Sequence, residues 1–566
     1  MHESLAPVLI VSGPHVSVKD RSVWHAVRKQ AASFRASSGA WLDVTFKLTG
    51  AEHLLALRRF RGSAAYCAAP YREAVDRYFA DARLFDPPEL AEVVLATLLE
   101  AEGLPYRAAT FGELYEDEGL RRRLLEECGC VLASTTLLRD LSELESLVAP
   151  LRRPGNRVVV GGALATLLAP TWPGLPSVDL VAAGPGEPLV PVLARWIRSG
   201  YRDLEPPPGG RIETVGGTPI LRAGPPPGRS LDGLPTPDWR LAERLHGRRF
   251  PVIHHESVRG CPFRCAFCSY PYLFDDTVCR RKSAARVAEE WGAYARQGVT
   301  HVSCLDSTFT HPRERVAELC ERLLADGTRL QWICYGRADD LADPALCRLM
   351  ARAGCLQVQV GVESGSPEIL RAMNKRCSPQ AAVAALGACR EAGISTFVTV
   401  IVGFPGETPA TVRETYALLR EARPDFAYPT PLTTRVETIP MLTPAGRAAL
   451  GLRTAELGRS AAPYWRHATM SCEEAAHWQR SMLRWMIDDR VALDSSLFYQ
   501  GMLSYRLEDR EALLDFQRDV ARAYPLLRRV FGAARYLAGR RLERDVERVL
   551  GAGARSFPVG SQTLEK

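Results

Sequence analysis

Three cysteines in one short segment have the clearest chemical potential in this chain. Cys261, Cys265 and Cys268 lie in the stretch SVRGCPFRCAFCSYP, with three and then two residues between them. A structural zinc site usually takes two C-x2-C pairs, or one such pair and two histidines, because zinc prefers four tetrahedral ligands. The first gap is one residue too wide and no second pair follows, so the spacing suits three irons of a cubane cluster whose fourth iron stays open. The alternative is three ordinary buried cysteines.

The cysteines follow an apolar run, FPVIHHE, that is typical of a buried strand. Short apolar runs and helical patterns then alternate over residues 240–440, which predicts about six β-α units and a partial, TIM-like (β/α)6 barrel. Such a barrel gathers its ligands at the carboxyl ends of its strands. The cysteine segment is therefore expected at the mouth of the barrel.

The rest of the chain divides by composition into further regions. Residues 1–201 alternate strand and helix patterns, except for a poorly patterned stretch over residues 19–86, and predict a doubly wound, Rossmann-like domain. Residues 202–239 are rich in Pro and Gly and are expected to be a linker. Residues 441–566 are mostly helical in pattern and are expected to form a C-terminal domain. The predicted fold class is α/β.

The overall composition is that of an ordinary globular protein. A chain of 566 residues, 46% hydrophobic and 24% charged, is expected to form more than one domain. The net charge of +7 is small and widely spread, so basic clusters are interpreted as solvated helix faces and no nucleic-acid partner is expected. There is no apolar run of about 18 residues or more and no signal-peptide pattern, so we expect a cytoplasmic protein without a membrane partner.

The cysteine segment resembles the C-x3-C-x2-C signature of the radical S-adenosylmethionine (SAM) enzymes, with an aromatic residue, Phe267, before the last cysteine. The resemblance implies that the three cysteines hold a [4Fe-4S] cluster and that the open iron is chelated by the amino and carboxylate groups of SAM. A low-potential cluster can pass one electron to the sulfonium of SAM, and the cofactor then performs the radical chemistry.

Other segments at predicted strand ends resemble the same family. In CLDSTFT, Asp306 is expected near the amino group of SAM, and in YGRADD, Arg337 is a partner for its carboxylate. In VGVESGSPEILRAMNKR, Glu363 and Ser364 would face the amino group or the ribose. The alternative for each acidic residue is helix capping.

The segment IVGFPGET follows the next predicted strand. The resemblance implies that Gly403, Phe404 and Pro405 offer backbone groups to the adenine, while Glu407 caps the turn. For Glu407, which directly precedes the helical pattern TPATVRETYALLREAR, capping and ligand contact are both open.

The amino-terminal region is similar to the cobalamin-binding domain that precedes the barrel in a large subgroup of the family. The segments that carry this resemblance are VVVGGALATLLAP, VDLVAAGPGE and the linker element SLDGLPTPDW. It implies that Ser134, Thr136, Gly161 and Gly162 line a groove for the nucleotide tail of cobalamin. The alternative is a plain doubly wound domain with a Gly-rich turn.

One departure from other cobalamin proteins concerns the cobalt ligand. The D-x-H-x-x-G loop is absent, and His15 in SGPHVSVKDR lacks that framing. We therefore expect cobalamin to bind base-off and without a histidine ligand, as in many radical SAM relatives that lack the histidine.

The function implied is a cobalamin-dependent radical SAM C-methyltransferase, which moves a methyl group from SAM through methylcobalamin to a carbon of a natural-product or peptide precursor. An aromatic amino acid such as tryptophan is one candidate substrate, and an external reductant such as flavodoxin or ferredoxin is the expected partner. Cyclisation, ring contraction or oxidation on the same scaffold are alternatives, since a fold does not fix its chemistry. A methylthiotransferase would need a second cysteine set, which we do not find. A non-catalytic iron-sulfur or cobalamin sensor is the alternative from another class.

Overall fold

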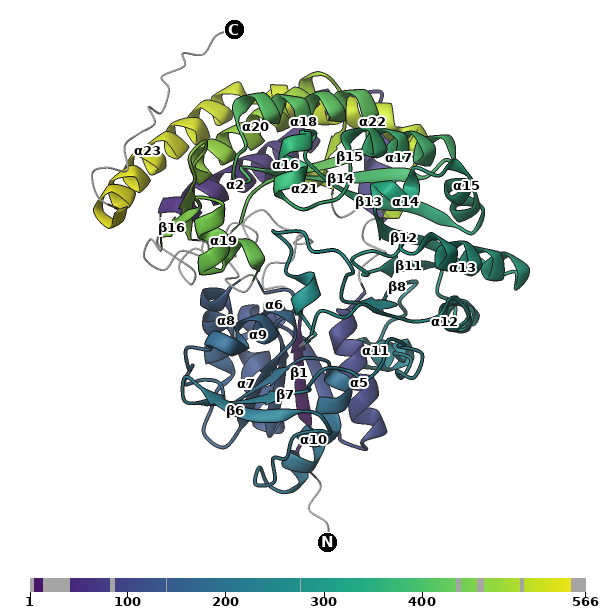
Figure 1. Cartoon of the computed structure of the whole chain (residues 1–566), viewed down its shortest axis with the longest axis vertical. Helices are drawn as coiled ribbons and strands as arrows, with labels where there is room; N and C mark the ends of the chain where they lie inside the picture. The colour runs from purple at the N-terminus through teal and green to yellow at the C-terminus, as the bar shows by residue number, and fades with distance from the viewer. Residues whose placement is uncertain are drawn as a thin grey trace.

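The computed structural model divides into a lower α/β lobe and an upper lobe that holds a second sheet and the C-terminal helices (Figure 1). Among the residues it describes, no helix is both long and apolar enough to span a bilayer. The described residues are 5–13, 41–81, 87–138, 140–274, 276–433, 439–455, 463–498 and 503–550.

The lower lobe is built on a seven-stranded sheet in the order β2-β1-β3-β4-β5-β7-β6. All neighbouring strands run parallel except β6 and β7. The strands are β1 (Val8–Ser12), β2 (Tyr106–Thr110), β3 (Cys130–Ser134), β4 (Arg157–Gly161), β5 (Leu180–Ala183), β6 (Arg211–Val215) and β7 (Thr218–Arg222). Helices cover both faces, so the predicted doubly wound sheet is confirmed.

Two separate apolar cores bind these helices to the sheet, because side chains of each strand alternate between its faces. The helices on one face are α5 (Leu90–Ala101), α10 (Gly186–Arg198) and α11 (Trp239–His246). Those on the other are α6 (Phe111–Glu116), α7 (Glu118–Glu127), α8 (Leu141–Val148) and α9 (Ala163–Leu168).

The hairpin β6-β7 lies inside the segment expected to be a linker. Its second strand pairs in parallel with β5, and Ile220 and Leu221 are buried in the two different cores of the lobe. The Pro and Gly content of the segment made these two short strands hard to predict, because Pro and Gly are common both in loops and beside the strands of a hairpin.

The second sheet has the order β18-β15-β14-β13-β12-β11-β8, with all strands parallel. Its strands are β8 (Val252–His255), β11 (His301–Cys304), β12 (Gln331–Gly336), β13 (Cys355–Glu363), β14 (Ser395–Val402), β15 (Phe426–Pro431) and β18 (Leu493–Asp494). Because β8 and β18 are the two ends of this order, the barrel is partial, as predicted.

Helices cover one face of this sheet and share a large apolar core with it. Strand residues such as Val358, Val360 and Val398 point into that core. The helices between the strands are α12 (Ala284–Arg296), α13 (Arg313–Ala325), α14 (Ala338–Leu341), α15 (Pro344–Arg352), α16 (Pro367–Ala372), α17 (Pro379–Glu391) and α18 (Pro409–Ala422).

The C-terminal region is mostly helical, as predicted. It contains α19 (Pro444–Ala449), the hairpin β16 (Arg453–Ala455) and β17 (Tyr464–Arg466), α20 (Cys472–Asp488), α21 (Ser495–Phe498), α22 (Arg510–Ala523) and α23 (Pro525–Leu550). It also supplies β18, which extends the barrel sheet by one short strand.

Three helices from the poorly patterned N-terminal stretch belong to the upper lobe: α2 (Trp41–Arg61), α3 (Ala64–Cys67) and α4 (Arg72–Asp81). They join an aromatic cluster with the barrel and the C-terminal helices, and Tyr71 donates a hydrogen bond of 2.7 Å to Asp519. The aromatic residues of this cluster are Phe60, Tyr66, Tyr71, Tyr78, Phe397, Phe426, Phe498 and Phe516. These three helices therefore pack in the upper lobe, although β1, which precedes them in sequence, belongs to the lower sheet, while His15 lies outside the described residues.

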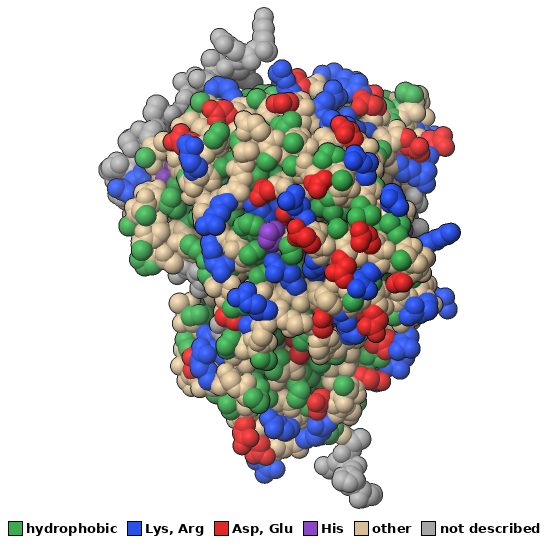
Figure 2. All heavy atoms as spheres, turned by 45° about the vertical axis from the view of Figure 1, so that its right-hand side comes forward, with side chains coloured by type: hydrophobic (Ala, Val, Ile, Leu, Met, Phe, Trp, Pro, Cys, Tyr) green, Lys and Arg blue, Asp and Glu red, His purple; other side chains and the backbone are tan. Residues whose placement is uncertain are grey.

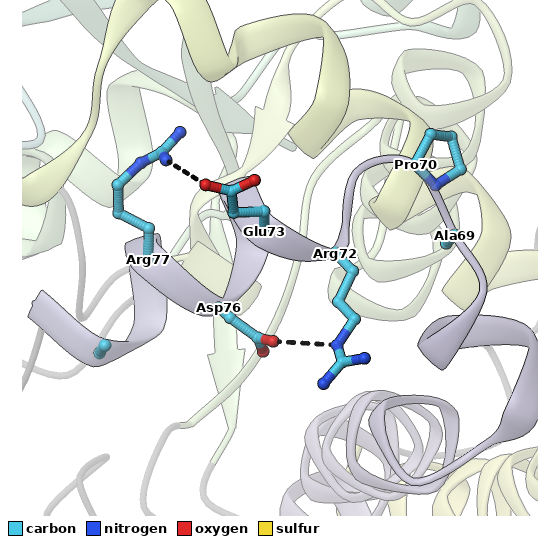
Figure 3. A pocket seen from close by; sticks show the side chains of 7 residues that line it. Ala69, Pro70, Arg72, Glu73, Asp76 and Arg77 are labelled. Atoms are coloured by element: carbon cyan, nitrogen blue, oxygen red, sulfur yellow. Dashed lines mark hydrogen bonds and ion pairs between the residues drawn. The ribbon is translucent and has the colours of Figure 1, made fainter.

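A surface groove of about 730 Å³ runs along α4 and the turn before it, and none of the predicted site residues lines it. Its charges are paired, Arg72 with Asp76 and Arg77 with Glu73 (Figure 3). On the face shown in Figure 2, basic and acidic side chains are likewise interspersed.

Candidate functional site

The cysteine segment follows β8 at the carboxyl edge of the barrel. The short strand β9 (Val258–Arg259) leads into it and pairs antiparallel with β10 (Arg280–Arg281). Gly260, with a φ of 76°, comes next, and a Cβ there would lie 2.5 Å from the carbonyl oxygen of Val278. Only glycine fits this turn, which directs the chain back toward the barrel mouth.

The three thiols are free and share this loop. Cys261 and Cys265 are buried, and Cys268 is half-buried. Burial raises the pKa of Cys268 to about 12 and raises that of Cys265 as well. A coordinated metal deprotonates such thiols outright, so binding of iron would supply the thiolate form.

No group of three or more His, Cys, Asp or Glu side chains within the described parts of the chain could hold one metal ion. In a [4Fe-4S] cubane, each thiolate is a terminal ligand of a different iron, so the three cysteine sulfurs lie apart outside the cube. Ligation of a [4Fe-4S] cluster by Cys261, Cys265 and Cys268 therefore stays a prediction, which rests on the cysteine spacing.

The loop is held against the barrel by hydrogen bonds to two segments, residues 373–374 and Met441. Ala266 donates to the carbonyl of Met373 at 2.9 Å, and the side chain of Asn374 donates to the carbonyl of Arg264 at 2.7 Å. Met441, from beyond the last main strand, donates to the carbonyl of Ala266 at 3.2 Å. The loop is therefore held before any cofactor binds.

Asp306 holds the start of the same loop. Its side chain is fully buried and accepts hydrogen bonds from the backbone N–H groups of Ser257 at 2.6 Å and Val258 at 2.8 Å, and from the Ser257 hydroxyl. Burial raises the pKa of Asp306 to about 6, against the opposing effect of Arg315. The oxygens of Asp306, expected near the amino group of SAM, are thus bound to the backbone and hydroxyl of the cysteine loop.

Arg337 lies against the cysteine loop. Its guanidinium carbon is 3.6 Å from the centre of the Phe263 ring, and its Nη2 donates to Asp339 at 2.6 Å and to the Arg376 carbonyl at 3.0 Å. The buried Nε has no hydrogen-bond partner among the described residues. A donor left open beside the cluster loop fits a ligand carboxylate.

Glu363 ends β13 with a φ of 66°, a left-handed conformation that is uncommon for a non-glycine residue, and follows a shift in strand register. Its Oε1 lies 3.0 Å from Nζ of Lys375, and both side chains are nearly buried. Backbone strain of this kind concentrates at functional sites. The sequence did not indicate Lys375, because its spacing from the cysteines has no recognisable pattern.

Ser364 is fully buried and serves the local backbone. Its hydroxyl contacts that of Thr415 at 3.2 Å and accepts from the N–H of Ser366 at 3.1 Å. The structure therefore places Ser364 in the buried turn between β13 and α16, where its hydroxyl binds Thr415 and Ser366.

Gly403, Phe404 and Pro405 form the buried turn after β14. At Gly403 the φ is 92°, and a Cβ would lie 2.5 Å from the Trp465 ring. Buried Glu407 accepts the N–H of Gly403, and His467 contacts the Gly403 carbonyl at 3.2 Å. The turn is thus closed by its own neighbours, and burial raises the pKa of Glu407 to about 8.

The residues assigned to the corrinoid groove do come together at the carboxyl edge of the lower sheet. The Ser134 hydroxyl lies 3.2 Å from that of Thr136, and a Cβ on Gly162 would lie 2.7 Å from the same Thr136 oxygen. Gly161 pairs with Ser134 across β3 and β4. Glu89, which sequence reasoning missed, accepts from Ser134 at 3.1 Å and from the Gly13 N–H at 2.8 Å.

The two carboxyl edges touch. Arg259, two residues before Cys261, forms a two-pronged ion pair with Glu187 at the start of α10, with N···O distances of 2.7 and 3.0 Å. The cysteine loop of the barrel therefore lies against the ligand edge of the lower sheet.

Comparison with known proteins agrees with this geometry. The radical SAM superfamily model matches residues 256–419. An uncharacterized methyltransferase of Pyrococcus horikoshii is 28% identical over 281 residues, which cover 48% of this chain and 59% of that protein. The anaerobic magnesium-protoporphyrin IX monomethyl ester cyclase of Rubrivivax gelatinosus is 27% identical over 308 residues, covering 53% and 55%. The chain thus spans little more than half the length of these curated relatives.

Two solved structures are similar in fold to most of this chain. TsrM, a radical SAM methyltransferase from Kitasatospora setae solved with cobalamin and a [4Fe-4S] cluster, superposes with a TM-score of 0.59 and 20% identity, covering 76% of this chain and 96% of TsrM. OxsB, solved with aqua-cobalamin and SAM, superposes with a TM-score of 0.53 and 15% identity, covering 82% and 78%. At these identities the likeness establishes a shared fold.

Proposed function

Because residues 256–419 form a radical SAM domain, we propose that this chain is a cobalamin-dependent radical SAM methyltransferase that transfers a methyl group from SAM to a carbon of a small molecule or peptide. The observation that carries the proposal is the direct apposition of two ligand edges. The cysteine loop of the barrel meets the sheet edge that gathers Ser134, Thr136, Gly161 and Gly162.

The cofactors would each be held by a distinct part of this interface. A bound cluster and SAM supply the methyl group and one-electron chemistry, and a corrinoid carries the methyl group between SAM and the substrate carbon. Cys261, Cys265 and Cys268 would bind the irons. Glu363 and Arg337 provide opposite charges for the two ends of the methionine moiety, which is the recognition that a zwitterion requires.

The proposed class of substrate is supported by the side chains on the face of the barrel sheet that the helices do not cover. Strand neighbours Tyr335 and Gln359, and likewise Thr399 and Tyr428, are paired in register. Because Val358 and Val398 point to the helices, alternation directs the adjacent Gln359 and Thr399 to the opposite face. These aromatic and neutral polar side chains favour an uncharged or aromatic group, for which tryptophan, the substrate bound in one TsrM structure, is a candidate.

Cyclisation is the second candidate, because a magnesium-protoporphyrin ester cyclase is among the curated relatives. The same two edges could gather the cofactors of either reaction, and the fold does not distinguish them. The difference between the reactions lies in their SAM products.

The test is an anaerobic assay of the reconstituted protein with SAM, cobalamin, a chemical reductant and candidate substrates. Methyl transfer produces S-adenosylhomocysteine in a corrinoid-dependent reaction. Production of 5′-deoxyadenosine without S-adenosylhomocysteine would contradict methyl transfer and support a cyclase or oxidase. If the wild-type protein cleaves SAM no faster than the Cys261→Ala variant, the sensor alternative stands.

A further inference from the structure

The ion pair between Arg259 and Glu187 is built as a rigid joint. The guanidinium contacts Glu187 through Nη2 at 2.7 Å and Nη1 at 3.0 Å, while its Nε donates to Glu256 at 2.8 Å. The exposed fractions of the Arg259 and Glu187 side chains are only 11% and 12%. A two-pronged contact fixes both the distance and the relative angle of its partners.

The barrel side of the joint is continuous with the cluster ligands. Arg259 is the last residue of β9 and stands two positions before Cys261. Its neighbour Val258 donates to Asp306 at 2.8 Å and accepts from the Tyr270 hydroxyl at 3.0 Å. Because the backbone is held on both sides, a shift of the guanidinium is passed on to the first cysteine.

The other side of the joint is continuous with the lower sheet. Glu187 is the second residue of α10, directly after β5 and the turn at Gly184. Side chains of α10 such as Leu189 and Leu193 are buried in the core beneath the sheet. Strand β5 pairs with β4, placing Ala182 beside Gly161 at the edge assigned to the corrinoid. The position of the Glu187 carboxylate therefore depends on the position of that edge.

We propose that Glu187 and Arg259 are a positioning pair that sets the separation between the cluster loop and the corrinoid groove. This inference rests on the proposed function, since it assigns the pair a role in the transfer between the two cofactors. Neither residue contacts the reacting atoms; the pair acts through Cys261 on one side and the β4-β5 edge on the other. Misplacement of reacting groups by about 1 Å can cost about 100-fold in rate.

Three variants separate positioning from charge. Glu187→Gln removes the charge at constant size, Glu187→Asp keeps the charge on a side chain one methylene shorter, and Arg259→Lys keeps the charge but loses the fork. The matched control is Glu100→Gln, which breaks the exposed ion pair of Glu100 with Arg244.

The readout is the magnetic interaction between the reduced cluster and cob(II)alamin, measured by electron paramagnetic resonance without substrate. This interaction depends on the separation and relative orientation of the two centres. We expect all three joint variants to keep their iron and corrinoid load but to change or broaden this interaction, and to form S-adenosylhomocysteine about 10- to 100-fold more slowly. The Glu100→Gln control should match the wild type in both measurements.

The outcomes distinguish this inference from the proposed function. If Glu187→Asp and Arg259→Lys load fully and match the wild-type spectrum and rate, the positioning role is wrong, whatever Glu187→Gln does. If the wild-type protein binds no corrinoid, the proposed function is wrong, and the positioning role that rests on it is wrong as well. If Glu187→Gln does not fold, the two charge-conserving variants still decide the question.

Discussion

Nζ of Lys375 lies 3.0 Å from Oε1 of Glu363, beside the cysteine loop. Lys375 also lies 6.0 Å from the ring centre of Phe267, the residue before Cys268. Burial lowers the pKa of Lys375, but the nearby Glu363 and Cys265 raise it by more. The net effect is a raised pKa, which favours the ammonium form. The residue assigned to SAM is therefore already part of a charge pair next to the cluster ligands.

Replacing Glu363 by Gln should weaken SAM binding about 10- to 150-fold. One charge-assisted hydrogen bond to the SAM ammonium is lost, which costs about 1.5–3 kcal/mol. The measurement is a SAM titration of the cluster-loaded protein. Glu368→Gln, at an exposed site in the same segment, is the control. Unchanged SAM affinity with a full cluster would move Glu363 out of the site.

Replacing Lys375 by Met should lower the reduction potential of the cluster. If Lys375 lies roughly 6 Å from the bound cluster, its charge would stabilise the more negative, reduced form by about 3 kcal/mol at an effective dielectric constant of about 20, or roughly 120 mV for one electron. Redox titration followed by electron paramagnetic resonance measures this shift. Exposed Arg413→Gln should leave the potential unchanged. A potential equal to the wild type would show that Lys375 does not act on the cluster.

Replacing Cys261, Cys265 and Cys268 together by Ala should remove about four irons per chain and the associated visible absorption. Iron analysis and an absorption spectrum after anaerobic reconstitution check this outcome. The exposed Cys67 provides the control, because Cys67→Ser should keep the full cluster. A full iron complement in the triple variant would refute the assignment.

Replacing Thr136 by Phe should block the corrinoid groove without disturbing the fold, since Thr136 is exposed. Gly161→Leu is a less clean test, because a Cβ there would lie 3.2 Å from the carbonyl oxygen of Ala182. Corrinoid bound after reconstitution should fall at least about tenfold, with iron content and melting temperature unchanged. A full corrinoid load in Thr136→Phe would place the groove elsewhere.

Glu407 should make stability depend on pH. Burial raises its pKa to about 8 from an ordinary value of 4.5, so the folded state holds a proton that the unfolded state releases. This contribution is complete below pH 4.5 and is lost as the pH rises to 8, amounting to at most about 5 kcal/mol.

Gln stays neutral at every pH. As the pH rises from 5 to about 8.5, the free energy of unfolding of Glu407→Gln should therefore fall less than that of the wild type. Denaturant unfolding of both proteins at each pH measures the difference, which cancels the contributions of other groups. Parallel pH profiles for the two proteins would show that Glu407 ionises normally.

Much of the architecture was predictable because local patterns and global topology agree. The alternation of strands and helices predicted the parallel strands of both sheets, and the cysteine spacing predicted the loop on which the site is centred. The hairpin β6-β7 and the helices α2 to α4 were not predicted, because their partners are distant in sequence and their own composition is ambiguous.

Individual site residues were less predictable, because a motif predicts where a residue lies in the fold but not which way its side chain points. Asp306 and Ser364 occupy the expected strand ends but turn inward to bind backbone groups. Lys375 and Glu89 were missed because only folding brings them to Glu363 and Ser134. The assignments of Asp306 and Ser364 to SAM stay predictions.

The crossing of α2, α3 and α4 to the upper lobe has a consequence for synthesis on the ribosome. Tyr71 and its partner Asp519 are 448 residues apart. At about 5–20 residues per second, the aromatic face of these early helices waits roughly 20–90 seconds before its C-terminal partners emerge. During that interval the nascent chain exposes Phe60, Tyr66 and Tyr78, which are buried in the native protein, and a chaperone would have its natural target there.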